Sequence, residues 1–145
     1  MKSENKIRVV IDTNILVSGL LFGGLPGQII DLVLVRQLVC CCSPLLKSEM
    51  DRVLMKPKFK LTENEYTSLT EPFYDEVEWY TPNFSISVIE RCPADNRVLE
   101  CAIESQSEFI ITGDRRDLVS LGTHEGIKIL QPKAFLEIFL ASKFT

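Results

Sequence analysis

Acidic side chains that directly follow apolar runs are the residues of this chain best placed to do chemistry. Asp12 follows the run "IRVVI" at residues 7–11, and Asp114 comes just after "FII" at residues 109–111. Short runs of this kind, rich in β-branched residues, are typical of strands buried within a parallel sheet. Open α/β sheets bind ligands at the carboxyl ends of their strands. We therefore expect Asp12 and Asp114 to lie at the same edge of one sheet.

Two further carboxylates fall on the apolar faces of predicted helices. Glu49 stands four residues before Val53 in a helix predicted over residues 44–55, so it lies on the apolar stripe. Asp95 lies in the first turn of a helix predicted over residues 93–106, three residues ahead of its apolar positions. A first-turn carboxylate complements the helix dipole, whereas a buried carboxylate needs a cation or hydrogen bonds. Both acids are thus expected to face the sheet.

If these four carboxylates converge, they need a positive partner, because close anions repel and raise each other's pKa values. Mg²⁺ and Mn²⁺ favour carboxylate oxygens and water, and one or two such ions position a phosphate and activate water. Asp117, three residues after Asp114, could reach the site from the following turn. Each acid alone also has a structural explanation, such as a helix cap at Asp12 or a turn at Asp114. Together, in this order, they favour a metal site.

The sequence offers few residues for other kinds of catalytic or binding site. The single histidine, His124, is flanked by glycines in a predicted surface loop and has no evident partner for a nucleophilic relay. Residues 22–27, "FGGLPG", lack the lysine of a phosphate-binding loop and are interpreted as a helix break. The run of cysteines at residues 40–42 lacks metal-ligand spacing and is interpreted as buried strand. An odd count of five cysteines suggests free thiols.

The order of the elements predicts an α/β fold with a mostly parallel sheet. Strands are predicted at residues 7–11, 38–42, 85–90, 109–111 and within 127–132. Helices are predicted at residues 14–20, from 26 onward, 44–55, 62–73, 93–106 and 132–140. We expect one domain over residues 1–145, with short tails at residues 1–6 and 142–145.

Composition excludes some classes of protein. No apolar run approaches the ~20 residues of a membrane helix, and the polar start "MKSENK" has no signal-peptide core after it, so a cytoplasmic protein is expected. The net charge of −4 argues against strong non-specific binding to nucleic acid but is compatible with a local basic patch.

Four segments in this order resemble the PIN domain family. They are "VVIDTNILVSGLL", "SPLLKSEMDRVLMKPKF", "ADNRVLECA" and "IITGDRRDL", which together span nearly the whole chain. The resemblance is to the branch that contains VapC-like ribonucleases, the toxins of toxin–antitoxin systems. It implies a three-layer α/β/α sandwich around a sheet of about five strands. It also implies hydrolysis of RNA phosphodiester bonds by water, dependent on one or two Mg²⁺ or Mn²⁺ ions.

The resemblance also assigns roles to individual residues. The catalytic and metal-binding residues would be Asp12, Glu49, Asp95 and Asp114, with Asp117 as an auxiliary metal ligand. Polar neighbours that orient carboxylates or water would be Thr13, Asn14 and Thr112. Candidates to hold the RNA backbone, being basic and close in sequence to the acidic positions, are Lys47, Arg52, Lys56, Lys58, Arg97, Arg115 and Arg116. The chain departs from this branch at Cys92 and Ala94, where acidic residues often stand.

Three functions remain open from the sequence. The first is a Mg²⁺- or Mn²⁺-dependent endoribonuclease, with RNA as substrate, an antitoxin as partner and a homodimer or higher oligomer as its assembly. The second is a catalytically inactive PIN scaffold that binds RNA or a protein, which the residues at positions 92 and 94 allow. The third is a phosphoacceptor signalling domain, which would want paired acids where Thr13 and Asn14 stand and a lysine after a late strand, whereas Lys128 opens the last strand.

Overall fold

A central, mostly parallel sheet organises the molecule. The computed structural model describes residues 6–89, 93–113 and 123–143. In these residues six strands form one sheet in the order β3-β2-β1-β4-β6-β5. The strands are β1 (Arg8–Ile11), β2 (Val39–Cys42), β3 (Glu78–Trp79), β4 (Phe109–Ile111), β5 (Thr123–His124) and β6 (Ile127–Leu130). All of the pairs are parallel except β5 with β6. The predicted α/β class with a mostly parallel sheet is confirmed, with six strands in place of about five.

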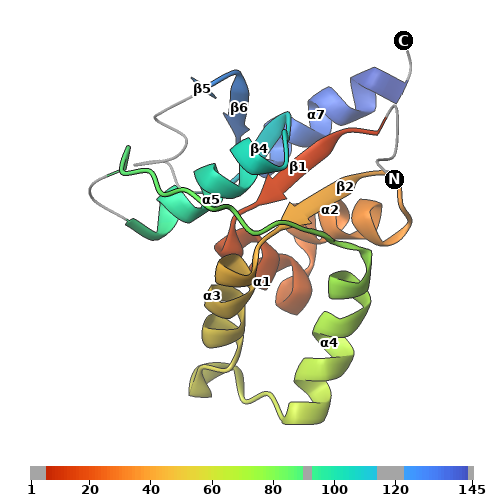
Figure 1. The fold of residues 1–145 in the computed structure, drawn as a ribbon. Coiled ribbons are helices and arrows are strands. Elements are labelled where there is room, and N and C mark those ends of the chain that lie inside the picture. Colours follow the sequence, from red (N-terminus) through yellow and green to blue (C-terminus); the bar gives the residue numbers. More distant parts are fainter. Residues whose placement is uncertain (1–5, 90–92, 114–122, 144–145) are drawn as a thin grey trace.

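Helices cover both faces of this sheet, which explains why its central strands are apolar throughout. Every residue of β1, β2 and β4 is buried. One face is covered by α5 (Pro93–Glu104), which contacts β1, β2 and β4, and the other by α1 (Thr13–Phe22) and α2 (Gly24–Leu34) (Figure 1). On that second face α7 (Pro132–Lys143) packs against α2 and continues two residues into the segment predicted as a tail. The result is the expected three-layer α/β/α arrangement.

Two further helices form an arm below the sheet in Figure 1. The first, α3 (Pro44–Leu54), begins as the sequence predicts, with the hydroxyl of Ser43 accepting a hydrogen bond from the Leu46 amide and Pro44 at the first helical position. A short 3₁₀ turn, η1 (Pro57–Phe59), leads to α4 (Glu63–Glu76). There Thr62 and Glu65 make a capping box. α3 packs on α1 and α4 packs on α2, so the arm is continuous with the core.

The strand predicted at residues 85–90 is wrong. Residues 85–89 are irregular, and the strand next to β2 is instead the two-residue β3, where Glu78 pairs with Cys41. The backbone of the irregular segment bonds to side chains of α5, with the Ile86 and Ile89 amides donating to Glu100 and Asn96, respectively. Because these side chains satisfy the amides of Ile86 and Ile89, those two residues need no neighbouring strand as partner.

The predicted loop position of His124 is also wrong, because His124 lies in β5. The hairpin from β5 to β6 turns at Glu125 and Gly126, with φ of 48° and 82°. Positive φ at both central residues is what a tight hairpin turn of the primed type requires. The Glu125 carboxylate lies 3.7 Å from Nε2 of His124.

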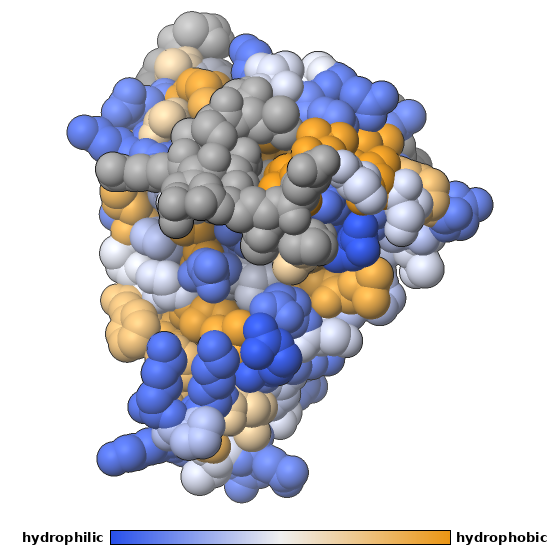
Figure 2. Space-filling model, turned by 90° about the vertical axis from the view of Figure 1, so that its left-hand side faces the viewer, coloured by the Kyte–Doolittle hydropathy of each residue, from blue (hydrophilic) through white to orange (hydrophobic). Residues whose placement is uncertain are grey.

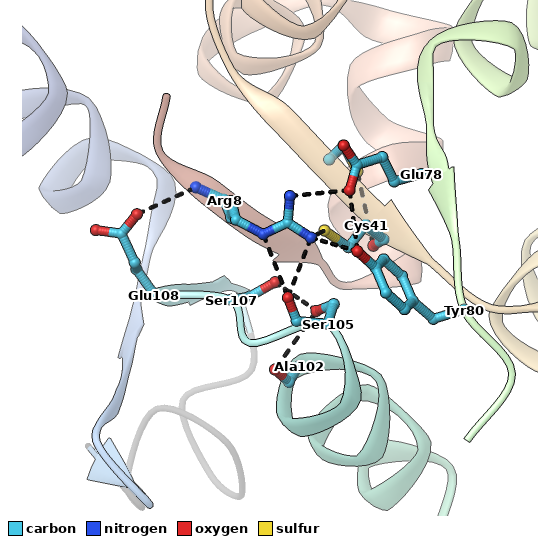
Figure 3. Close-up of polar contacts among 9 residues, drawn as sticks. Arg8, Cys41, Glu78, Tyr80, Ala102, Ser105, Ser107 and Glu108 are labelled. Carbon is cyan, nitrogen blue, oxygen red and sulfur yellow. Dashed lines mark hydrogen bonds and ion pairs between the residues drawn. The ribbon is translucent and has the colours of Figure 1, made fainter. Parts of the chain in front are cut away.

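Arg8, the first residue of β1, ties three elements together (Figure 3). Its guanidinium makes an ion pair with Glu78 at 2.8 Å. The same group donates to the Ser105 carbonyl oxygen at 3.1 and 3.2 Å and to the Tyr80 hydroxyl at 2.5 Å. The side chain is 10% exposed. These bonds join β1 to β3 and to the end of α5, so the Arg8 guanidinium stabilises the fold.

The cysteine run is buried strand, as the sequence indicates. Cys40, Cys41 and Cys42 form most of β2, and they and Cys101 are buried free thiols. Burial raises the pKa of the Cys42 thiol to about 12, so it remains protonated at neutral pH. Cys92 lies outside the described residues.

In the part of the chain that the structure describes, no single helix is long and apolar enough to cross a membrane. The helices α1 and α2 reach that length and composition only as a pair, bent by 93°. Each of them buries one side against the core.

Candidate functional site

A cleft of about 210 Å³ lies at the carboxyl end of β1. Three separate parts of the chain line it: the residues after β1, the first half of α3 and the first turns of α5. Its polar and small lining residues include Asp12, Thr13, Asn14, Glu49, Ala94 and Asp95. The structure therefore brings together three of the four acidic residues singled out from the sequence, and the two polar neighbours after Asp12.

Asp12 is held in place by the strand before it and the helix after it. Its amide donates to the Ile111 carbonyl oxygen at 2.9 Å, which extends the pairing of β1 with β4 by one residue. Its own carbonyl oxygen accepts from the amides of Ile15 and Leu16 and so begins α1. The side chain makes no helix-capping hydrogen bond. The capping explanation for this carboxylate is therefore excluded.

Thr112 orients the Asp12 carboxylate. Its hydroxyl donates to Oδ2 of Asp12 at 2.7 Å. Thr112 is fully buried, and its amide donates to the Leu130 carbonyl oxygen at 2.9 Å, which fixes it between β4 and β6. Hydrogen bonds to a charged acceptor are roughly twice as strong as neutral ones. The carboxylate thus has a defined direction before any ligand arrives.

Glu49 is less buried than its predicted place on the apolar stripe implies. The buried stripe of α3 consists of Leu46, Met50 and Leu54. Glu49 lies beside that stripe, with its side chain 36% exposed. Arg52 binds it with two contacts, of 2.6 Å from Nη2 to Oε1 and 3.1 Å from Nε to Oε2. The cation that this carboxylate was expected to need is therefore Arg52.

Asp95 is 8% exposed in the first turn of α5. Its neighbour Asn96 accepts from the Ile89 amide at 2.9 Å and donates to the Ile89 carbonyl oxygen at 2.8 Å. Arg97 donates to the Ile86 carbonyl oxygen at 3.1 Å. The start of α5, and with it Asp95, is therefore fastened to the segment before it.

Asn96 and Glu100 are buried polar residues that the sequence did not single out. Glu100 is 3% exposed and accepts from the Ile86 amide at 2.8 Å and from Arg97 at 2.7 Å. The available signal was their spacing of four residues within a helix, which places both polar groups on one face.

The basic candidates differ in their surroundings. Arg97 lines the cleft, with its side chain 32% exposed. Arg52 is bound to Glu49, and Lys47 to Asp51 at 2.7 Å. The remaining described candidates, Lys56 and Lys58, are exposed around η1.

Asp51 is a further carboxylate that the sequence analysis missed. It accepts from Lys47 and from the hydroxyls of Tyr66 and Tyr74, which join α3 to α4. Burial raises the pKa of this carboxyl, but the three hydrogen bonds outweigh burial and hold the pKa below its ordinary value. Asp51 thus fastens the helix that carries Glu49.

The donor chemistry of the cleft fits a hard divalent cation, since it offers carboxylate oxygens from three elements. Within the described segments, however, no three acidic, histidine or cysteine side chains are close enough to form a metal site as they stand. The bidentate contact with Arg52 occupies Glu49, so a cation in the cleft has to compete with that guanidinium. Four of the predicted residues lie outside the described part of the chain: Asp114, Arg115, Arg116 and Asp117.

A larger cavity, of about 630 Å³, lies at the opposite end of the sheet. It is lined by the first residues of β4 and β6, including Glu108, Phe109 and Lys128. Ligands of open α/β sheets bind at the carboxyl ends of the strands, and the buried acidic residues lie there too. We therefore take the smaller cleft as the candidate functional site.

Comparison with known proteins identifies the family of this chain. The family model of the PIN domain matches residues 8–116, from the first residue of β1 to beyond the end of β4. The chain is also 34% identical, over 146 aligned positions, to the uncharacterized protein MJ1680 of Methanocaldococcus jannaschii, and the alignment covers 92% of each protein. The family match spans Asp12, Glu49, Asp95 and Asp114. This chain belongs to the PIN domain family.

Proposed function

We propose that this protein is a Mg²⁺- or Mn²⁺-dependent endoribonuclease with Asp12, Glu49, Asp95 and Asp114 as its catalytic carboxylates. PIN domains are generally nucleases that act on RNA and use divalent metal ions. The observation that carries the proposal is the cleft itself, where carboxylates from three separate elements line one space of about 210 Å³.

In this proposal, the chain's own residues position the metal and the phosphodiester. Asp12, oriented by the Thr112 hydroxyl, and Asp95, fixed at the start of α5, would hold the ion with Glu49. The divalent ion supplies Lewis acidity toward the phosphate and the attacking water. Water adds to phosphorus, one P–O ester bond breaks, and the proton passes to solvent or to the leaving oxygen. Asp117 would act as an auxiliary ligand.

Among the basic residues, Arg97 is the best supported contact for the RNA backbone because it lines the cleft. Arg97 also binds a carboxylate, Glu100, at 2.7 Å, as Lys47 and Arg52 bind Asp51 and Glu49, so each would have to share or release its partner to bind RNA. Arg115 and Arg116 stay predictions, as do the roles of Thr13 and Asn14 as polar neighbours.

The proposal is tested with calorimetric Mn²⁺ titration and RNA cleavage on the same samples. Asp12→Asn removes one charge from the cleft, and we expect it to abolish both metal binding and cleavage. Asp31→Asn is the matched control, since Asp31 is exposed on α2. Wild-type protein that binds no Mn²⁺ and cleaves no RNA, beside an active control nuclease, would count against the proposal.

That negative result would favour a second function, a PIN scaffold that binds RNA or a protein without catalysis. Two observations support this alternative. Ala94 lines the cleft where relatives often carry an acid, and Arg52 occupies Glu49.

The toxin role, an antitoxin partner, a homodimer and a cytoplasmic location stay predictions from the family resemblance. Light scattering on the purified protein tests the homodimer. Growth arrest on induced expression, absent for Asp12→Asn, tests the toxin role.

A further inference from the structure

A second hollow adjoins the carboxylate cleft. It has a volume of about 350 Å³ and is lined by the start of α3, residues 82–85 and one side of α5. We call it the Phe84 hollow; its side chains include Leu45, Pro82, Asn83, Phe84, Arg97 and Glu100. Leu45 and Arg97 line both the hollow and the cleft. A ligand in the hollow is therefore next to whatever occupies the cleft.

The chemistry of the hollow suits an uncharged flat ring. Phe84, Pro82 and Leu45 offer apolar surface, and Leu45 is 62% exposed. Its two charged groups, Arg97 and Glu100, are paired with each other at 2.7 Å. Because these two charges balance, the hollow has no net charge to favour a phosphate, whereas a nucleobase needs a surface for stacking and a polar group at its edge. The Asn83 amide can provide that polar group.

The size of the hollow suits one nucleotide. Ligand pockets generally range from about 300 to 1,000 Å³, and about 350 Å³ is at the lower end of that range. On the face of the molecule drawn in Figure 2, apolar and hydrophilic side chains lie side by side.

The hollow is also fixed relative to Asp95. The segment that contains Phe84 continues to Ile86 and Ile89, whose backbone groups bond to Arg97, Glu100 and Asn96 of α5. The same helix carries Asp95 in its first turn. One wall of the hollow and one carboxylate of the cleft therefore keep a set spacing, which reduces the cost of ordering a ligand across both.

Resting on the nuclease function proposed above, we propose that the Phe84 hollow binds the nucleobase next to the phosphodiester in the cleft. The base packs on the Phe84 ring and against Leu45, with the Asn83 amide at its edge. A base can enter only when it is unstacked and unpaired. The hollow thereby selects single-stranded RNA.

The first experiment measures the binding of fluorescein-labelled hexauridylate and hexaadenylate by anisotropy, in EDTA so that no cleavage occurs. The proteins are wild type, Phe84→Ala, Phe84→Trp and the control Val88→Ala, an exposed residue outside the hollow. Loss of a base-stacking side chain weakens binding by about 5- to 150-fold. We expect that loss for Phe84→Ala, near wild-type affinity for Phe84→Trp, and no change for Val88→Ala.

The second experiment locates the base. Hexauridylates that each carry one abasic site are bound to wild type and to Phe84→Ala. If the ring stacks on one base, the effect of Phe84→Ala disappears when that base is missing and persists at the other positions. A merely structural role of Phe84 would weaken all of the oligonucleotides equally, and that result would overturn the proposal.

The outcomes separate this inference from the nuclease proposal. Wild-type cleavage with Mn²⁺ together with equal RNA affinity of Phe84→Ala and Val88→Ala would refute the base site and leave the nuclease standing. Wild-type protein that neither binds nor cleaves RNA would refute both. Unchanged RNA affinity with an altered oligomeric state of Phe84→Ala would assign the hollow to a second copy of the chain.

Discussion

Replacing Thr112 by valine tests whether the direction of the Asp12 carboxylate matters. Valine has nearly the volume of threonine but lacks the hydroxyl that donates to Oδ2 of Asp12 at 2.7 Å. Since Thr112 is fully buried, water cannot readily replace the lost donor. A hydrogen bond to a charged group contributes about 1.5–3 kcal/mol. We therefore expect Thr112→Val to lower the free energy of unfolding by about 2 kcal/mol.

The larger effect is expected on metal binding. Loss of a residue that orients a metal ligand typically reduces metal affinity or activity by about 10- to 100-fold. Calorimetric Mn²⁺ titration measures the affinity, and cleavage at several Mn²⁺ concentrations shows whether excess metal restores the rate. Thr112→Ser is the matched control because it keeps the hydroxyl, and it should keep both properties near the wild-type level.

Denaturant unfolding of both variants shows whether the assays use folded protein. One result would refute the reasoning: Thr112→Val binds Mn²⁺ and cleaves RNA as the wild type does, while Asp12→Asn loses both. Asp12 would then be a ligand whose direction the Thr112 hydroxyl does not determine.

Three further substitutions and one labelling experiment have defined expected outcomes. Arg52→Ala frees Glu49 from its bidentate partner, and we expect Mn²⁺ to bind several-fold more tightly by calorimetry. Arg8→Met leaves a partly buried carboxylate without its ion pair and should lower the free energy of unfolding in urea by about 3 kcal/mol. Asp51→Asn should lower the free energy of unfolding by about 2 kcal/mol at neutral pH. Because the folded pKa of Asp51 lies below its ordinary value of 3.8, the difference between wild type and Asp51→Asn should shrink as the pH falls from about 4. Native Cys42, with a pKa raised to about 12, should resist iodoacetamide at pH 8 and react only after unfolding, as peptide mass spectrometry would show.

Glu137→Gln on α7, at an exposed residue, is a control for the stability measurements. Unchanged Mn²⁺ affinity in Arg52→Ala would mean that Glu49 is not a ligand. A pH-independent effect of Asp51→Asn would mean that the charge of this carboxylate does not stabilise the fold.

The central part of the fold could be predicted because its strands are buried on both faces. The continuous apolar runs around Val10 and Ile110 have that pattern, and a carboxylate directly after such a run is unusual enough to locate the edge of the sheet. β3 could not be predicted in this way, because it has only two residues, Glu78 and Trp79, neither of them buried. The apolar residues near Ile89 suggested a strand. Periodicity does not reveal that side chains of α5, in place of a neighbouring strand, accept hydrogen bonds from the backbone of this segment.

The position of Glu49 shows a second limit of periodicity. The sequence placed it on the apolar stripe of its helix, and the stripe that is buried runs one residue further along, through Met50. A difference of one residue rotates a helix face by about 100°, so a carboxylate predicted to be buried lies at the margin of the stripe. Only the packing of α3 on α1 decides between these faces.

The central position of β1 in the sheet also affects when the site is completed during synthesis. β1 is made before β4, and one hundred residues separate Asp12 from Thr112. At 5–20 residues per second, a ribosome needs roughly 5–20 s to add them. Until then one side of β1 has no neighbour and the Asp12 carboxylate has no orienting hydroxyl. Pairing across such a long sequence separation is also intrinsically slow. Every described residue that lines the carboxylate cleft is therefore made before β4, whereas the hydroxyl that orients Asp12 is added only after it.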